Sequence, residues 1–194
     1  MVACRCSGIF PGIFLALGVA LLAWVTISAE ENKEKNKQKK AVNLIANPSF
    51  EEVETKPAHW VLAAVAEGGK ARLSASDDNP KAGKHCIRIQ GEAEWATFVS
   101  NRIPLEKGKK YVLTGWVRVK KGNGYIKIDY FDNDKYLDMT MAEPSDSSEW
   151  TKQQVETEAE KLEKATHLTA TLVGTGEFEV YFDELHLEAQ ENRK

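Results

Sequence analysis

The chain has 194 residues, of which 42% are hydrophobic and 28% are charged, and its formal net charge is −3. This length suits one domain with a single core once the N-terminal segment is set aside, and the composition is ordinary for a globular protein. The weak acidity argues against a nucleic-acid partner, because binding to phosphates needs a concentrated basic patch, but it leaves neutral polysaccharides open as ligands.

Residues 1–29 have the pattern of a targeting segment. Arg5 supplies a short positive region, an apolar run follows over residues 9–27, and small residues at 28–29 provide a cleavage point. The run is also just long enough to span a bilayer, so a retained anchor helix is the alternative to a cleaved signal peptide. We therefore expect a secreted or cell-envelope protein that meets the membrane only through an uncleaved N-terminal segment.

Residues 30–42 read EENKEKNKQKKAV, a charged stretch with too little apolar surface to fold, and they predict a flexible linker. If residues 1–29 are removed, Cys86 is the only cysteine left, so no intrachain disulfide can form. We expect Cys86 to be a small packed residue. Residues 43–188 are predicted to form one domain, and residues 189–194 a polar tail.

The patterning of residues 43–188 is that of β-strands separated by turns. The strongest strand signals, from alternation and β-branched or aromatic content, are 111–119, 125–131, 166–173 and 177–187. Weaker ones are 60–65, 70–75, 85–90, 95–103 and 150–157. Turn residues separate them at 77–80, 106–109, 121–124, 132–134 and 174–176, and only 158–165 has a helical pattern. Eight or nine strands with so little helix predict an all-β fold, an antiparallel β-sandwich or jelly roll.

Alternation assigns the two faces of these strands. The residues predicted to face the core are Tyr111, Leu113, Val117, Val119, Ile126, Ile128, Tyr130, Ile87 and Ile89. Trp60, Trp95 and Trp150 are also expected to pack in the core. The turn 132–136 is a candidate rim of a ligand-binding site, with Tyr136 at its edge.

The outward-facing residues include candidate ligand-binding side chains. These are Trp116, Arg118, Tyr125, Lys127, Asp129, Arg88 and Gln90. If their faces share one sheet, they form a shallow platform on which aromatic rings stack on sugar C–H surfaces and polar groups bind hydroxyls. The alternative is a covered or ion-paired surface that binds no sugar.

An ordered set of segments resembles the CenC-type carbohydrate-binding modules, which have a galactose-binding-domain-like jelly-roll fold. The segments are Asn43–Glu51 (NLIANPSFE), Trp60, Gly83–Ile89 (GKHCIRI), Pro104–Arg118, Trp150–Thr151 and Val180–Leu187 (VYFDELHL). The resemblance covers residues 43–187. It implies a non-catalytic module that binds polysaccharide or oligosaccharide on a sheet face or a loop rim.

The resemblance also implies a structural Ca²⁺ ion where the first and last strands meet. Glu51 and Asp183 fall on the matching motif positions, and Ca²⁺ prefers hard oxygen ligands of this kind. Backbone carbonyls near Asn43 and Lys84 would complete the shell. The alternative is that both acids are solvated residues at strand ends.

Catalytic motifs are missing from the sequence. The four histidines have no metal-site spacing, and no nucleophile elbow, phosphate-binding loop or dinucleotide fingerprint is present. Acid pairs occur, but nothing in the sequence places two carboxylates across a cleft as a glycosidase requires. We therefore expect a carbohydrate-binding module that is not an enzyme; the alternative is a cell-envelope domain that binds another protein.

Overall fold

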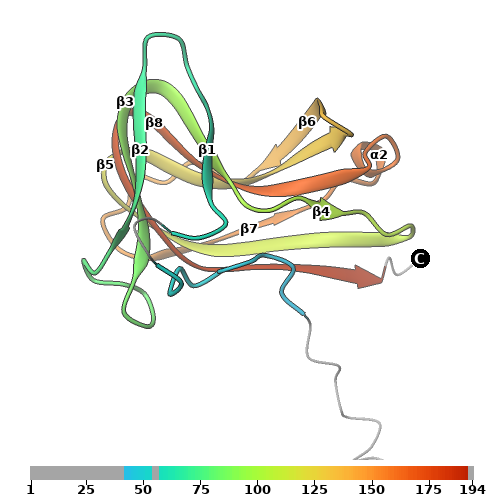
Figure 1. Cartoon of the computed structure of the whole chain (residues 1–194), viewed down its shortest axis with the longest axis horizontal. Helices are drawn as coiled ribbons and strands as arrows, with labels where there is room; N and C mark the ends of the chain where they lie inside the picture. Colours follow the sequence, from blue (N-terminus) through green and yellow to red (C-terminus); the bar gives the residue numbers. More distant parts are fainter. Residues whose placement is uncertain (1–41, 54–56, 192–194) are drawn as a thin grey trace, which may run out of the picture. The chain divides into compact units, whose positions relative to one another are not determined.

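The computed structural model describes residues 42–53 and 57–191, which form strands and one short helix (Figure 1). The elements are β1 (Val61–Val65), β2 (Lys70–Ser76), β3 (Cys86–Val99), β4 (Ile103–Pro104), β5 (Lys109–Asp132), β6 (Lys135–Met141), β7 (Thr151–Glu156), α2 (Ala159–Leu162) and β8 (His167–Glu191). The predicted signal or anchor segment 1–29 and the linker up to residue 41 lie outside the described residues. Within the described residues, no helix is long and apolar enough to cross a membrane.

Three long strands, β3, β5 and β8, each belong to two layers of the fold. The first half of β5 pairs with the second half of β8, where Leu113 lies opposite Leu187. The second half of β5 pairs with the first half of β8, where Ile128 lies opposite Ala170. β3 pairs with the other edge of β8, along both halves of β8. A single hydrogen-bonded sheet is therefore folded over on itself.

We call the two layers the first sheet and the second sheet. The first sheet contains β2, residues 86–93 of β3, residues 177–191 of β8, residues 109–121 of β5, and β7. The second sheet contains β1, residues 96–99 of β3, β4, residues 167–174 of β8, residues 123–132 of β5, and β6. Figure 1 shows them as the lower and upper ribbons at the right, joined at the left where the long strands bend. The predicted antiparallel β-sandwich is confirmed.

The bend between the sheets lies at small residues. The register of β3 against β8 shifts between Ala93 and Ala96, which lie opposite Gly176 and Gly174, and β5 bends at Gly122. Gly122 has a φ of +70°, and a Cβ there would lie 2.6 Å from the carbonyl oxygen of a residue in β8, so only glycine fits. The chain-reversing turns that we expected at 121–124 and 174–176 are therefore wrong. Each strand continues through its glycines into the other sheet, as glycines inside a strand often allow.

The core lies between the two sheets and consists of the residues that alternation predicted. Every residue predicted to face inward is at most 2% exposed. Trp60 is 1% exposed and packs against Phe50 with ring centroids 5.4 Å apart, as predicted. Cys86 is fully buried, and burial raises the pKa of its thiol to about 12.

Two tryptophans contradict the core prediction. Trp95 is 40% exposed, because it lies in the irregular stretch between Ala93 and Ala96 where strict alternation is lost. Trp150 lies outside the core cluster, and its Nε1 donates a hydrogen bond to the carbonyl of Asn79 on the outer side of the first sheet.

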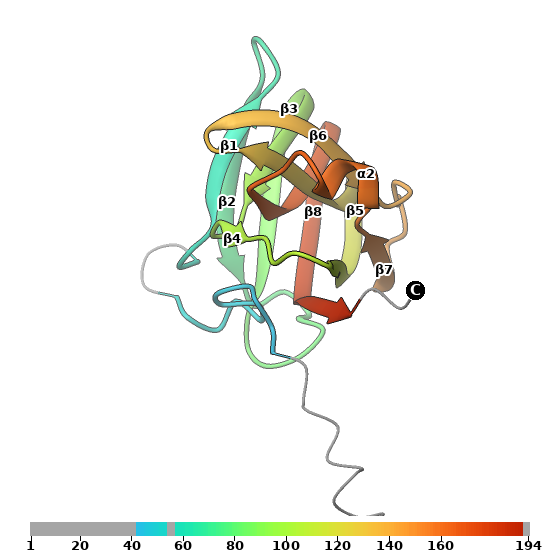
Figure 2. The same ribbon diagram turned by 90° about the vertical axis from the view of Figure 1, so that its right-hand side faces the viewer.

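The ends of the elements differ from the prediction in two places. β8 continues to Glu191, three residues into the predicted polar tail, because its last residues pair with Lys109–Tyr111 at the start of β5. β6 was not predicted as a strand; it forms a hairpin with the end of β5. The helix α2 lies within the predicted helical segment 158–165. It lies with β4 at the end of the sandwich that faces the viewer in Figure 2.

Candidate functional site

The structure separates the seven predicted ligand residues into two groups. Arg88, Gln90, Trp116 and Arg118 lie on the first sheet, whereas Tyr125, Lys127 and Asp129 lie on the second sheet. The cause is the bend at Gly122, which carries the second half of β5 into the other layer. The single platform that would have joined all seven does not form.

The outer face of the first sheet carries stacked cationic and aromatic side chains. Arg88, Tyr181 and Arg118 are cross-strand neighbours on β3, β8 and β5. The guanidinium of Arg118 lies 4.1 Å from the ring centroid of Tyr181, and the Arg118 residue is only 6% exposed. Gln90 lies two residues further along β3, opposite Glu179. A cation this deeply covered is held by its protein neighbours and not by solvent.

The loop of residues 77–85 covers this face. Arg118 donates a hydrogen bond of 2.6 Å to the carbonyl of Asp78, whose carboxylate pairs with Lys120. The hydrogen bond from Lys120 lowers the pKa of Asp78 below its usual value. The ammonium of Lys81 lies 3.8 Å from the ring centroid of Trp116. The face is therefore covered and ion-paired, and the ligand-binding role of its four candidate residues stays a prediction.

The two predicted calcium ligands hold this same loop. The Oδ2 of Asp183 accepts hydrogen bonds from the amides of residues 81–82 at 2.8 and 3.0 Å, and the Oε1 of Glu51 accepts from the amides of residues 84–85 at 2.9 and 3.0 Å. Asp183 is 0% exposed, and burial raises its pKa to about 6. None of the ion pairs among the described residues includes Asp183. The described residues also contain no cluster of three acidic, histidine or cysteine side chains around one metal position.

A buried polar chain crosses the outer face of the second sheet. Lys127 and Asp129 form an ion pair with an Nζ–Oδ1 distance of 2.7 Å, and the hydroxyl of Thr171 donates to the Oδ2 of Asp129 at 2.6 Å. The Lys127 and Asp129 residues are 8% and 4% exposed. Thr169 continues the chain, 3.4 Å from Thr171 between hydroxyl oxygens. Alternation on neighbouring strands puts all four side chains on one face.

Aromatic side chains surround this polar chain. Phe131 stacks on His167 with centroids 5.1 Å apart and rings 5° from parallel, and its edge meets Tyr136 at 5.7 Å. Tyr136 lies on β6 and is 49% exposed, whereas Tyr125 is half-buried. Burial, and then the nearby charge of Asp129, raise the pKa of both tyrosines. Tyr125 lies two positions before Lys127 on β5, on the same face as the ion pair.

A hollow of about 460 Å³ opens on this face beside the aromatic stack. Val61, Ala63 and Val99 form an apolar wall on β1 and β3, and Asn101, Arg102, His59, Thr169 and His167 supply polar atoms. His167 is 8% exposed, and burial, helped by the charge of Arg102, lowers its pKa. The described residues that line this hollow include no acid.

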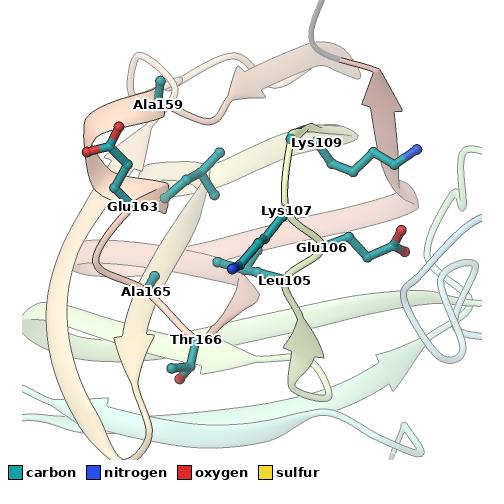
Figure 3. A pocket seen from close by; sticks show the side chains of 10 residues that line it. Leu105, Glu106, Lys107, Lys109, Ala159, Glu163, Ala165 and Thr166 are labelled. Atoms are coloured by element: carbon teal, nitrogen blue, oxygen red, sulfur yellow. The ribbon is translucent and has the colours of Figure 1, made fainter.

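A second hollow of about 620 Å³ lies between the turn before β5 and the helix α2 (Figure 3). Leu105, Leu162, Lys107 and Glu163 are among the residues that line it. Its lining residues include no aromatic side chain. It therefore lacks the flat surface on which a sugar ring stacks.

Sequence reasoning identified part of the second-sheet surface. It placed Tyr125, Lys127 and Asp129 on one outward face and named Tyr136 as a rim residue. It missed Arg102 and the polar residues of β8. Alternation along 166–173 could have found His167, Thr169 and Thr171, because all three fall on the same side of that strand.

Solved structures resemble this fold over about three quarters of the chain or more. The CBM22-1 xylan-binding domain of Paenibacillus barcinonensis Xyn10C superposes with a TM-score of 0.58 at 16% identity, over 79% of this chain and 97% of that domain. A family 16 carbohydrate-binding module gives 0.54 at 17% identity, over 75% of this chain and 99% of the other. The Stig cyclase Fisc from Fischerella sp. TAU gives 0.56 at 16% identity, over 79% of this chain and 100% of the other. Likeness at these identities shows the jelly-roll fold, which serves more than one activity.

The fold is the jelly roll of these carbohydrate-binding modules. A family model described as a carbohydrate-binding domain matches residues 42–172. The match covers more than half of the chain, so this protein belongs to that family of carbohydrate-binding domains. The resemblance found in the sequence is thereby confirmed. Among proteins with curated descriptions, no sequence matches this chain.

Proposed function

We propose that the outer face of the second sheet is the glycan-binding surface of this carbohydrate-binding domain. The observation that carries the proposal is the combination on one face of a hollow, a partly exposed tyrosine and fixed polar groups. The outer face of the first sheet lacks this combination, because the loop 77–85 already occupies its arginine and tryptophan side chains.

The chemistry of this face suits a sugar ring. Tyr136 and Tyr125 offer aromatic surface for the C–H face of a pyranose. Lys127 is as deeply covered as Arg118, but among the described residues its ammonium bonds Asp129 alone, so two of its three N–H donors are left for a sugar hydroxyl that reaches them. The buried ion pair fixes these donors before the ligand arrives, which lowers the entropy cost of binding.

We also propose that the domain has no catalytic activity of its own. Hydrolysis of a glycosidic bond requires two carboxyl groups on opposite sides of that bond. Asp129 is the carboxylate at the polar chain, and both of its oxygens already bind Lys127 and Thr171. The hollow beside it is lined by no acid among the described residues.

Titration calorimetry with a panel of soluble polysaccharides, beginning with xylan, tests the binding surface. Tyr136→Ala should weaken binding about tenfold, as expected for one lost stacking contact. Trp116→Ala on the first sheet is the matched control and should leave the affinity unchanged. Loss of binding in Trp116→Ala alone would place the ligand on the first sheet. No binding to any glycan by the folded protein would favour the alternative of a protein-binding domain.

We further propose that a Ca²⁺ ion binds beside Glu51 and Asp183 and fixes the loop 77–85. The backbone amides of residues 81, 82 and 184 offset part of the cost of burying the Asp183 carboxylate, and a divalent cation would offset more of it. Two carboxylates provide only part of the six to eight oxygen ligands that Ca²⁺ takes, so carbonyl groups of the backbone would supply the rest.

We propose that the protein is exported through residues 1–29. The support is the sequence pattern of a basic residue, an apolar run and small residues before Glu30. Intact-mass measurement of the protein recovered outside the expressing cell tests this. A mature chain that begins at Glu30 is expected, whereas a full-length, membrane-bound product would indicate a retained anchor.

A further inference from the structure

The hollow on the second sheet is lined by basic side chains and by no acidic one among the described residues. Arg102 is the fixed cation in its lining, with His167 and His59 as further basic groups. The protein as a whole has a formal net charge of −3, so its long-range field repels anions. A site that attracts a negative ligand on such a protein must do so through these local groups.

Arg102 already holds a carboxylate from the protein itself. Its Nη2 lies 2.6 Å from the Oδ1 of Asp134, which belongs to the hairpin between β5 and β6. The two residues approach from either side of the strand that carries His167, because Pro104 and Phe131 are the register partners of that histidine. The ion pair therefore stands at the end of the hollow that contains the aromatic stack.

This ion pair is easily exchanged. The side chain of Arg102 is 64% exposed and that of Asp134 is 86% exposed. Exposed pairs of this kind contribute little to stability, so an incoming carboxylate can replace Asp134 at small cost. A guanidinium also presents a planar pair of donors that matches a carboxylate in two parallel hydrogen bonds.

The buried neighbour adds a second polar contact. His167 is 8% exposed and is stacked on Phe131, so its ring is fixed in place. Among the described residues, its only hydrogen-bond contact is from Nδ1 to the hydroxyl of Thr166 at 3.5 Å. The opposite wall of the hollow, Val61 and Val99, is apolar and suits the C–H face of a sugar ring.

We infer that this hollow recognises a glycan that carries a carboxylate, namely a uronic acid residue, and that the carboxylate binds Arg102 in place of Asp134. This inference rests on the proposed glycan-binding surface and names the ligand class of that surface. Asp134 then serves as an internal competitor that neutralises Arg102 until the ligand arrives.

Calorimetry with two matched ligands tests the inference. The probes are the sodium salt of a galacturonic acid hexamer and its fully methyl-esterified form, which keeps the rings but lacks the charges. The protein should bind the acid about tenfold more tightly than the ester, as one charge-assisted pair implies. Neutral xylan serves as a third probe that does not depend on the carboxylate.

Opposing variants locate the effect. Arg102→Gln should abolish the preference for the acid, whereas Asp134→Asn should strengthen binding of the acid severalfold and leave the ester unchanged. Arg72→Gln makes the same charge change on an exposed residue of β2 and should leave the preference intact.

The outcomes separate this inference from the proposed function. Equal binding of acid and ester, or a preference that survives Arg102→Gln, overturns the uronic acid inference. If xylan or the ester still binds in that case, the glycan-binding surface stands. If no probe binds the folded protein, the proposed binding surface fails and the inference fails with it.

Discussion

At the residue scale, the second-sheet surface depends on a few buried polar side chains. Lys127 and Asp129 lie two positions apart on β5, so alternation puts both on the same face. They are buried as an ion pair, and Thr171 from the neighbouring strand satisfies the other carboxylate oxygen. The arrangement costs desolvation energy, but it places fixed donors beside the hollow.

Asp129→Ala should destabilise the protein by roughly 3–5 kcal/mol, because it leaves the ammonium of Lys127 buried without a partner. The double variant Lys127→Met with Asp129→Leu should recover most of that loss, since it removes both charges. Urea unfolding of the two variants and the wild type measures the difference. A double variant as unstable as Asp129→Ala would show that the ion pair itself stabilises the fold.

His167 should make stability fall as the pH is lowered. Burial and Arg102 depress its pKa in the folded protein below the ordinary 6.5, so the unfolded chain binds a proton first. The stabilisation is complete above about pH 6.5 and is lost as the pH falls toward the folded pKa. The free energy of unfolding of the wild type should therefore decline between pH 7.5 and 5.5 more steeply than that of His167→Gln. If the free energy of unfolding declined equally with pH in the wild type and in His167→Gln, His167 would not be the cause of the pH dependence.

At the element scale, the long strands decide where the candidate residues lie. β5 alone supplies Trp116 to one sheet and Tyr125 to the other, although the two residues are nine positions apart. The change of layer occurs at Gly122, where a side chain would meet the backbone of β8. The separation of the two surfaces is thus a consequence of backbone geometry at one residue.

Gly122→Ala should destabilise the fold by roughly 3 kcal/mol, from the strain of a positive φ and from contact with the β8 carbonyl 2.6 Å from the new Cβ. Gly108→Ala is the matched control, because Gly108 has a φ of +77° but no atom within 4 Å of a new Cβ. It should cost only about 1 kcal/mol. Thermal unfolding monitored by circular dichroism compares the two. A similar loss of stability in both variants would mean that the close approach to the β8 carbonyl does not add to the cost of a side chain at Gly122.

At the scale of the whole molecule, the start and the end of the domain are tied together. The amide of Leu44 donates to the carbonyl of Leu187 at 2.9 Å, and the side chain of Asn43 bonds the backbone of Leu185 and Leu187. Glu51 and Asp183 then hold the loop 77–85 from these same two segments. A calcium ion at this junction would stabilise contacts between parts of the chain more than 130 positions apart.

Millimolar Ca²⁺ should raise the melting temperature by about 5 °C, and EDTA should reverse the change, if the ion binds the folded state alone at about 100 times its Kd. Asp183→Asn should remove this response. Glu52→Gln, an exposed neighbour of Glu51, should keep it. Differential scanning calorimetry in both buffers gives the comparison. A wild type that melts at the same temperature with Ca²⁺ and with EDTA would refute the calcium proposal.

The sequence by itself determined the fold class and which residues of the long strands face the core. Alternation in β5 and β8 reports which side chains face the core, because a strand turns every second residue to the same side. The ordered segments from Asn43 to Leu187 were also sufficient to indicate the family. These properties are local, or depend on the order of segments along the chain, so reading the sequence can recover them.

Only the tertiary structure decided which outward residues meet. Trp116 and Tyr125 are close in sequence but lie on different sheets. Arg102 and His167 come from separate segments and line one hollow, and Asp134 from a third segment pairs with Arg102 at its end. The physical reason is that alternation within a strand decides whether a side chain points outward. Strand pairing and the bend at Gly122 decide which of the two outer surfaces that side chain belongs to. Strand pairing joins distant residues, and no pattern within a single strand specifies it.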